Sequence, residues 1–230
     1  MLRQNSGMRD ISVRRVGFGY FVRPAAETGT GAARAEPALG YLVEHPDGLL
    51  LVDSGMGGDD WVDAHYQPRR VPLPDALRAA GSEPDAIRYL VNCHLHFDHC
   101  GGNPKLAGRP IFTQRVELDA ARRTADYTLP ELIDAPGLSY VELDGETEIL
   151  PGVLIVPTPG HTAGHQSVVV RRADGTVIVA GQSHDTATAY GVDVLAHGAG
   201  IGDPPGWLGR LRELDPRRVM FAHDNAVWEP

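Results

Sequence analysis

Residues 94–99 read His94-Leu95-His96-Phe97-Asp98-His99. Four side chains able to bind a metal ion fall within these six positions, although the 230-residue chain has only 10 histidines. The preceding residues, 87–93, are apolar and rich in strand formers, so we expect His94 at the end of a buried strand. Side chains two positions apart on an extended chain share a face, which predicts that His94 and His96 point at one location. This is not the helical His-Glu-x-x-His arrangement, whose ligands lie four residues apart.

Two later segments also place a histidine directly after a predicted strand. The apolar residues 153–156 lead into a turn rich in glycine and proline that contains His161, and residues 219–222 lead into His223. Turns of this kind commonly position functional groups. Imidazoles from three strand ends are therefore predicted to meet at one location.

The ordered motifs resemble those of the metallo-β-lactamase superfamily: His-x-His-x-Asp-His at 94–99, Gly-His-Thr-x-Gly-His at 160–165, and the late strand-end His223. The resemblance extends from about residue 40 to residue 223. It implies an α/β fold of four layers, an αββα sandwich in which two mixed sheets pack face to face and a metal centre lies at one edge. It also implies that residues 49–55 form an early strand and turn whose carboxylate, Asp53, supports the site.

The resemblance further implies a ligand set and a catalytic residue. The implied ligands are His94, His96 and His161 for a first metal ion and Asp98, His99 and His223 for a second. Three neutral imidazoles suit Zn²⁺ and leave a fourth position for water, as catalytic zinc sites require. Asp98 is the predicted catalytic residue, which would bind the second ion and accept a proton from the attacking water or orient that water.

The chain departs from the family at Gln182, where relatives usually end a strand in Gly-Asp and bridge both metal ions with the carboxylate. A neutral amide offers one oxygen, removes a negative charge and bridges two ions poorly. We expect Gln182 to be a weak ligand, so that the second ion binds less tightly than in relatives or recruits a substitute from residues 183–185, Ser-His-Asp. The predicted cofactor is therefore one or two zinc ions.

The implied reaction is hydrolysis by a metal-activated water. Phe97 and the Gly-Gly-Asn at 101–103 look most like the N-acyl homoserine lactonase group, which predicts a quorum-quenching lactone or ester hydrolase with a small-molecule substrate. Such lactonases usually keep a tyrosine where this chain has Asp185, and Tyr190 is the candidate substitute. Two alternatives stay open: a mononuclear iron sulfur-oxygenase of the persulfide dioxygenase type, and a metal-binding protein whose catalysis has lapsed.

The remaining histidines and the two cysteines are interpreted without a metal. Those outside the motifs, expected to be ordinary core or surface residues, are His45, His65 and His197. His165 is expected to support its turn, whereas His184 stays open between the site and an ordinary loop. Cys93 is one residue out of phase with His94, and we predict a small buried thiol.

Composition narrows the class of protein. Hydrophobic residues make up 42% and charged residues 22% of the chain, which is usual for a globular protein, and the length suits one domain over residues 1–230. A net charge of −9 disfavours a nucleic-acid partner, and no apolar run approaches the roughly 20 residues of a membrane span. Two cysteines and the lack of an apolar core in residues 1–20 predict a cytoplasmic protein. The oligomeric state is not predicted.

Several segments outside the motifs have a predicted structure. Residues 24–37 are rich in small residues and predict a flexible loop, and residues 56–74 predict a loop bordering the pocket, with Trp61 and Tyr66 available to cover an apolar substrate. Residues 74–80 and 114–124 predict helices. The outer polar face of the second is assigned to Arg115, Glu117, Asp119, Arg122 and Arg123.

Overall fold

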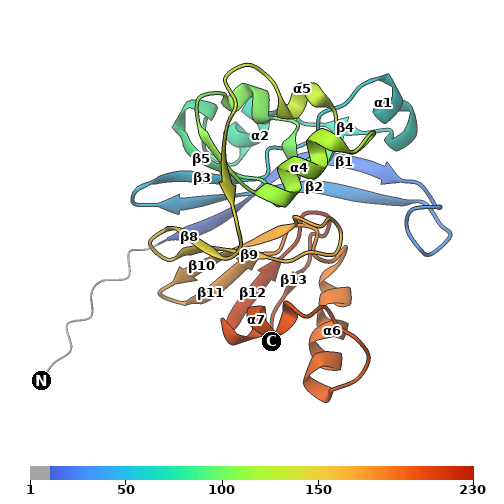
Figure 1. Ribbon diagram of the computed structural model, residues 1–230, viewed down its shortest axis with the longest axis vertical. Helices are drawn as coiled ribbons and strands as arrows, with labels where there is room; N and C mark the ends of the chain where they lie inside the picture. Colours follow the sequence, from blue (N-terminus) through green and yellow to red (C-terminus); the bar gives the residue numbers. More distant parts are fainter. Residues whose placement is uncertain (1–10) are drawn as a thin grey trace, which may run out of the picture.

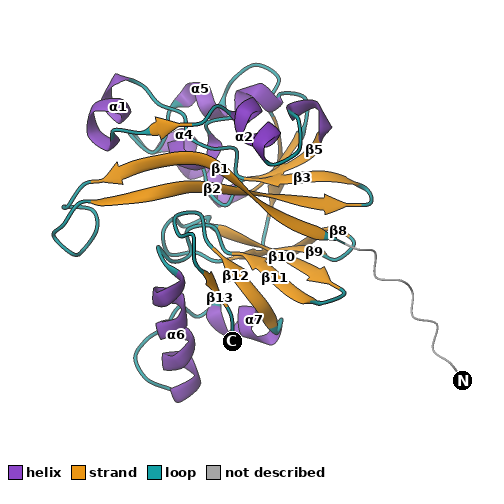
Figure 2. Ribbon diagram, turned by 180° about the vertical axis from the view of Figure 1, so that it is seen from behind, coloured by secondary structure: helices purple, strands orange, loops and turns teal. Residues whose placement is uncertain are grey.

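Two β-sheets face each other between outer layers of helices in the computed structural model, which describes residues 11–230 (Figures 1 and 2). This arrangement confirms the expected αββα sandwich. Residues 1–10, part of the segment 1–20 whose lack of an apolar core contributed to the predicted location, lie outside the described residues. Among residues 11–230, no helix combines the length and apolar character that crossing a bilayer would need.

The N-terminal sheet has seven strands in the order β4-β1-β2-β3-β5-β6-β7. These are β4 (Arg69–Arg70), β1 (Ser12–Arg23), β2 (Arg34–His45), β3 (Gly48–Val52), β5 (Ile87–Val91), β6 (Pro110–Gln114) and β7 (Ser139–Leu143). The pairs β3–β5, β5–β6 and β6–β7 are parallel, whereas the pairs β1–β2 and β2–β3 are antiparallel. The sheet is therefore mixed, as expected.

The C-terminal sheet has six strands in the order β13-β12-β11-β10-β9-β8. These are β13 (Val227–Trp228), β12 (Pro216–Met220), β11 (Gly175–Val179), β10 (Gln166–Arg172), β9 (Val153–Pro157) and β8 (Thr147–Leu150). Only the β11–β12 pair is parallel among these strands. Backbone bonds from Gln166 N–H to Cys93 O and from Leu39 N–H to Ala222 O join the two sheets at 2.9 Å each, near the metal-binding motifs.

Helices cover both outer faces. Over the N-terminal sheet lie α1 (Asp60–Tyr66), α2 (Leu73–Ala79), α4 (Arg115–Arg123) and α5 (Pro130–Ile133), and against the C-terminal sheet lie α6 (Ala187–Ala199) and α7 (Leu208–Glu213) (Figure 1). The short helices are α3 (Phe97–Cys100), η1 (Pro84–Ala86) and η2 (Asn103–Leu106). The helices predicted at 74–80 and 114–124 are thus confirmed within one residue at each end as α2 and α4.

Alternating side chains explain why the central strands are buried on both faces. On β2, Tyr41 and Val43 enter the core between the sheets, whereas Leu42 enters the core beneath α2. On β3, Leu51 likewise points to the helix side. Because successive side chains on a strand point to opposite faces, a continuous apolar run fills both layers at once.

Two predicted loops are partly regular structure. The loop predicted at 24–37 ends at residue 33, because β2 begins at Arg34 and pairs with the end of β1 (Arg23↔Arg34). The loop predicted at 56–74 contains α1, whose first turn is capped by Asp59 accepting from Val62 N–H at 2.8 Å. In both cases a local capping or pairing interaction outweighed a composition typical of loops.

Candidate metal centre

The three histidines implied for the first ion converge. His94 and His96 follow β5, and His161 lies in the turn after β9. Each offers a ring nitrogen within 4.8 Å of the other two. The His161 Nε2 and His96 Nδ1 atoms are 3.1 Å apart, and the His94 and His96 ring centroids are 4.5 Å apart. We call this group the histidine cluster.

His94 shows that the histidine cluster fits a cation. Its side chain is 0% exposed, and neither ring nitrogen has a hydrogen-bond partner within residues 11–230. Leaving a buried polar group without a partner costs about 1–3 kcal/mol. A metal ion bound to His94, His96 and His161 would remove that cost.

The protonation states of the cluster also suit a metal. Burial lowers the pKa of His96 to about 4 and that of His161 to about 3, and burial holds the pKa of His94 well below its usual value. The imidazoles are therefore neutral at pH 7 and keep the lone pairs that a metal ion needs.

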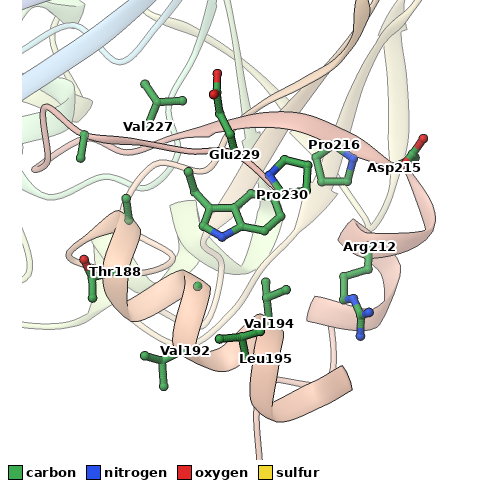
Figure 3. A pocket seen from close by; sticks show the side chains of 14 residues that line it. Thr188, Val192, Val194, Leu195, Arg212, Asp215, Pro216, Val227, Glu229 and Pro230 are labelled. Atoms are coloured by element: carbon green, nitrogen blue, oxygen red, sulfur yellow. The ribbon is translucent and has the colours of Figure 1, made fainter. Parts of the chain in front are cut away.

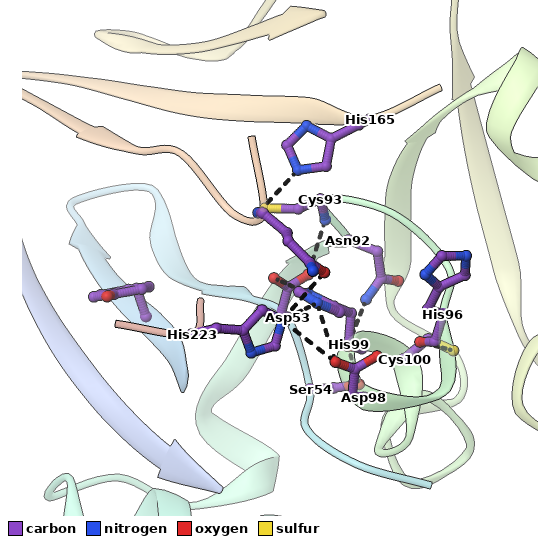
Figure 4. A network of polar contacts seen from close by, with 12 residues as sticks. Asp53, Ser54, Asn92, Cys93, His96, Asp98, His99, Cys100, His165 and His223 are labelled. Carbon is purple, nitrogen blue, oxygen red and sulfur yellow. Dashed lines mark hydrogen bonds and ion pairs between the residues drawn. The ribbon is translucent and has the colours of Figure 1, made fainter. Parts of the chain in front are cut away.

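A second group gathers beside the first. His99 Nε2 lies 3.2 Å from His223 Nε2, and Asp98 Oδ2 lies 3.3 Å from His223 Nε2 and 3.6 Å from His99 Nε2 (Figure 4). Asp98 and His99 belong to α3, and His223 follows β12. Together with His94, the side chains of Asp98 and His99 also satisfy the spacing of a metal site. We call Asp98, His99, His223 and Gln182 the mixed cluster.

Outer hydrogen bonds fix which nitrogens face the mixed cluster. His99 Nδ1 donates to Asp53 Oδ2 at 2.8 Å, and His223 Nδ1 donates to the Pro37 carbonyl at 2.9 Å. Each ring therefore turns its Nε2 toward Asp98. Asp53 also accepts from Cys93 N–H at 2.8 Å, and it adopts a left-handed backbone (φ 59°) that aspartate tolerates better than most residues. The supporting role expected for this carboxylate matches these contacts.

Charge distinguishes the mixed cluster from the histidine cluster. Burial raises the pKa of Asp98, but the imidazoles of His99 and His223 outweigh burial and lower this pKa to about 2. Burial likewise opposes protonation of His99, yet Asp53 and Asp98 raise its pKa above the usual value. The mixed cluster thus contains a carboxylate and an imidazole that readily holds a proton.

Gln182 directs its amide oxygen into the mixed cluster. Gln182 Oε1 lies 3.2 Å from His223 Nε2, while Gln182 Nε2 donates to Asp185 Oδ1 at 3.4 Å. Asp185 in turn accepts from Arg34 at 3.1 Å. The amide oxygen therefore faces His223 in the mixed cluster, and the hydrogen bond to Asp185 orients the amide. The role of Gln182 as a ligand stays a prediction. Of the other two substitute candidates, His184 donates to Asp193 at 3.0 Å, and the Ser183 hydroxyl lies 3.4 Å from His184 Nδ1.

Residues expected to lie outside the ligand set have other partners. Both ring nitrogens of His165 have partners, because Nε2 accepts from Gln182 N–H at 3.0 Å and Nδ1 lies within hydrogen-bond distance of Thr158 in its own turn. The histidines outside the motifs also have partners: His45 contacts the Pro151 carbonyl, His65 contacts Glu27 and His197 contacts Arg212. Cys93 is buried in the core between the sheets, as expected.

Tyr190 does not replace the missing tyrosine. It is 0% exposed and packs against Phe221 and Trp228 in the core beneath α6 and α7. Its hydroxyl has no hydrogen-bond partner within the described residues. The hypothesis that Tyr190 reaches into the centre is therefore not supported by its contacts.

Glu117 was wrongly assigned to the outer polar face of α4. It is 0% exposed and accepts hydrogen bonds from Leu95 N–H, the Tyr127 hydroxyl and the Thr162 hydroxyl. A signal was present in the sequence, because Glu117 lies one helical turn before the buried Ala121 and shares its face. Because Glu117 is charged, it was expected on the exposed face of α4 and not on the buried one.

A separate pocket of about 850 Å³ lies between α6 and the C-terminal residues (Figure 3). Its lining includes Val192, Leu195 and Trp228, and none of its lining residues is a histidine or cysteine. Its two carboxylate side chains, Asp215 and Glu229, belong to no group of three or more potential metal ligands among residues 11–230.

Comparisons with known proteins agree with this geometry. Residues 33–223 match the family model described as the metallo-β-lactamase superfamily. An N-acyl homoserine lactonase from a Bacillus species is 32% identical over 205 residues, covering 82% of this chain and 81% of that protein. The lactonase AttM of Rhizobium johnstonii is 30% identical, covering 87% of this chain and 86% of its own length.

A solved structure of an N-acyl homoserine lactone hydrolase, with the product N-hexanoyl-L-homoserine at its catalytic metal centre, superimposes with a TM-score of 0.76. It is 27% identical in sequence, and the match covers 93% of each chain. The fold of this protein and that of the solved relative thus agree over most of both chains.

Proposed function

The chain belongs to the metallo-β-lactamase superfamily, and on that basis we propose that it is a metal-dependent hydrolase that opens the lactone ring of N-acyl homoserine lactones. Hydrolysis of such signals would make it a quorum-quenching enzyme. The observation that carries the proposal is the buried, unpartnered imidazole of His94 at the point where the histidine and mixed clusters meet.

The chemistry of the donors favours zinc. His94, His96 and His161 would hold a first ion, and the mixed cluster would hold a second. Neutral imidazoles are good Zn²⁺ ligands, and no thiolate is available because Cys93 and Cys100 are buried with pKa values raised by burial. A bound zinc ion lowers the pKa of a coordinated water to about 7 and polarises a carbonyl oxygen.

Asp98 would orient the attacking water rather than store its proton. Its pKa is about 2, because the positive character of His99 and His223 outweighs the effect of burial. A carboxylate this acidic accepts a hydrogen bond at neutral pH but holds a proton poorly. The sequence left open whether Asp98 accepts a proton from the attacking water or orients that water, and we therefore favour orientation.

Aromatic side chains extend from the centre to the surface and suit an acyl substituent. Phe21 packs edge-on against His223 with ring centroids 5.4 Å apart, and Phe97 stacks on Tyr66 at 5.0 Å. Trp61 continues this surface and is 62% exposed. An apolar chain attached to a polar lactone would contact this wall while the ring reaches the metal ligands.

The test is acid release from N-hexanoyl-L-homoserine lactone, measured in a pH-stat with protein loaded with zinc. We expect turnover that stops when a chelator removes the metal and returns when zinc is restored. An H94A variant is the matched control, because it removes the ligand shared by both groups. Zinc-loaded protein without lactone turnover would reject the proposal.

The same preparation separates the alternatives. Iron content with oxygen consumption on a persulfide would indicate the sulfur-oxygenase, which usually has an acidic residue where this chain has Gln182. Tight metal binding without turnover of lactones, esters or thioesters would indicate a binding protein. We also infer a cytoplasmic location from the two free thiols, which a reducing compartment preserves.

A further inference from the structure

We propose that Glu117 is a positioning residue that holds the three histidines of the histidine cluster in the geometry of a metal site. The inference rests on the proposed function, because it assigns a role toward the metal ion of that same site. Glu117 comes from α4, outside every motif that supplies a ligand.

Two of the three hydrogen bonds to Glu117 come from a residue that is next to a ligand in the sequence. Leu95 N–H donates to Glu117 Oε1 at 2.8 Å, and Leu95 stands between His94 and His96 in the chain. The Thr162 hydroxyl donates to Glu117 Oε2 at 2.7 Å, and Thr162 directly follows His161. One carboxylate therefore ties together the two chain segments that supply the histidine cluster.

The third bond acts on a ligand ring. The Tyr127 hydroxyl donates to Glu117 Oε1 at 2.6 Å, and the Tyr127 ring packs against the His96 ring at an interplanar angle of 56°, with centroids 4.8 Å apart. The orientation of His96 is thus held through a side chain that Glu117 anchors.

Close packing keeps this arrangement rigid. A Cβ atom added at Gly164 would lie 2.4 Å from the Glu117 backbone nitrogen and from its Cβ, so the turn carrying His161 rests directly on α4. Glu117 and Thr162 are both buried. A carboxylate is well suited here, because three donors face it and an ionised carboxylate only accepts.

The test measures metal affinity rather than turnover. Zinc binding is measured by chelator competition, and bound Co²⁺ reports ligand geometry through its visible absorption spectrum. In E117A we expect affinity for the first ion to fall by roughly 10–100-fold, the usual effect of losing an outer partner of metal ligands, with an altered Co²⁺ spectrum. D119N on the same helix, at an exposed side chain, is the matched control and should behave as wild type.

A second pair of variants covers the case in which E117A does not fold. T162V removes the hydroxyl at nearly constant volume, whereas T162S keeps it. We expect T162V to weaken the first ion by about 3–10-fold and T162S to restore wild-type binding. A purely structural role would lower the melting temperature of metal-free protein but leave affinity and spectrum unchanged in folded variants.

The outcomes distinguish this inference from the proposed function. If wild-type protein binds zinc and T162V, together with any folded E117A, matches its affinity and Co²⁺ spectrum, the positioning role is wrong while the hydrolase proposal stands. If wild-type protein binds neither zinc nor Co²⁺, both are wrong. Weaker binding in T162V with recovery in T162S supports the positioning role whether or not lactones are hydrolysed.

Discussion

The histidine cluster and the mixed cluster lie side by side but are built on different electrostatic principles. The histidine cluster has three imidazoles with lowered pKa values and is braced by the buried Glu117. The mixed cluster has an ionised Asp98, an amide at Gln182 and a His99 whose pKa is raised, and it is braced by Asp53. We infer that the histidine cluster can bind a cation directly, whereas His99 in the mixed cluster must first lose a proton.

The largest expected effect comes from removing the carboxylate that only the mixed cluster contains. D98A should lower kcat/KM for an N-acyl homoserine lactone by roughly 10²-fold or more, because the attacking water loses the side chain that orients it. It should also release the second ion while the first stays bound, as counted by metal analysis after gel filtration. Near-normal turnover would remove Asp98 from the reaction, and loss of both ions would end the distinction between the clusters.

The brace of the mixed cluster is the next target. D53N keeps a residue that tolerates the left-handed backbone but loses the charge that holds His99. We expect affinity for the second ion to fall by roughly 10–100-fold, with the first ion unaffected. Chelator competition on the two-ion protein measures both constants, and equal weakening of both ions would contradict separate bracing by Asp53 and Glu117.

A substitution at Gln182 tests the difference between the two clusters by strengthening the binding of the second ion. Q182D restores the carboxylate that relatives usually have, and we expect affinity for the second ion to rise about tenfold because ligand charge strengthens cation binding. Q182A, which offers no ligand, is the matched control and should weaken it. If the affinity for the second ion were unchanged in both variants, the side chain at position 182 would not contact that ion.

The smallest effect is a difference in pH dependence between the two ions. The pKa values of His96 and His161, about 4 and about 3, keep these rings deprotonated from pH 6 to 8, so first-ion affinity should stay nearly constant. The raised pKa of His99 means that metal must displace a proton there, so second-ion affinity should fall by at most about tenfold per unit as pH decreases. Proton release in weak buffer measures this, and equal release for both ions would contradict it.

The order of motifs was sufficient to predict the fold and the convergence of the motif histidines. His94 and His96 converge because residues two apart on an extended segment share a face, even though β5 itself ends at Val91. The phase of Cys93 also placed it in the core as predicted. These predictions succeeded because they depend on local geometry within a few residues.

What the sequence did not reveal depends on packing between distant segments. The Glu117 carboxylate has a partner in the interior partly because the turn at Thr162 rests on α4 and brings a donor to it. The orientation of the Gln182 amide depends on Asp185, which Arg34 holds from a strand far away in sequence. Arg34 was itself assigned to a loop, because its pairing with Arg23 on β1 is not visible in composition.

Gly164 has a consequence for engineering. Its place in the Gly-His-Thr-x-Gly-His motif is explained by a steric fit to a helix, since any side chain there would collide with the backbone of Glu117. Transplanting the histidine-bearing loops alone into another scaffold would therefore carry over the ligands but not the surface on which they rest. A portable version of this centre would have to include α4 as part of the graft.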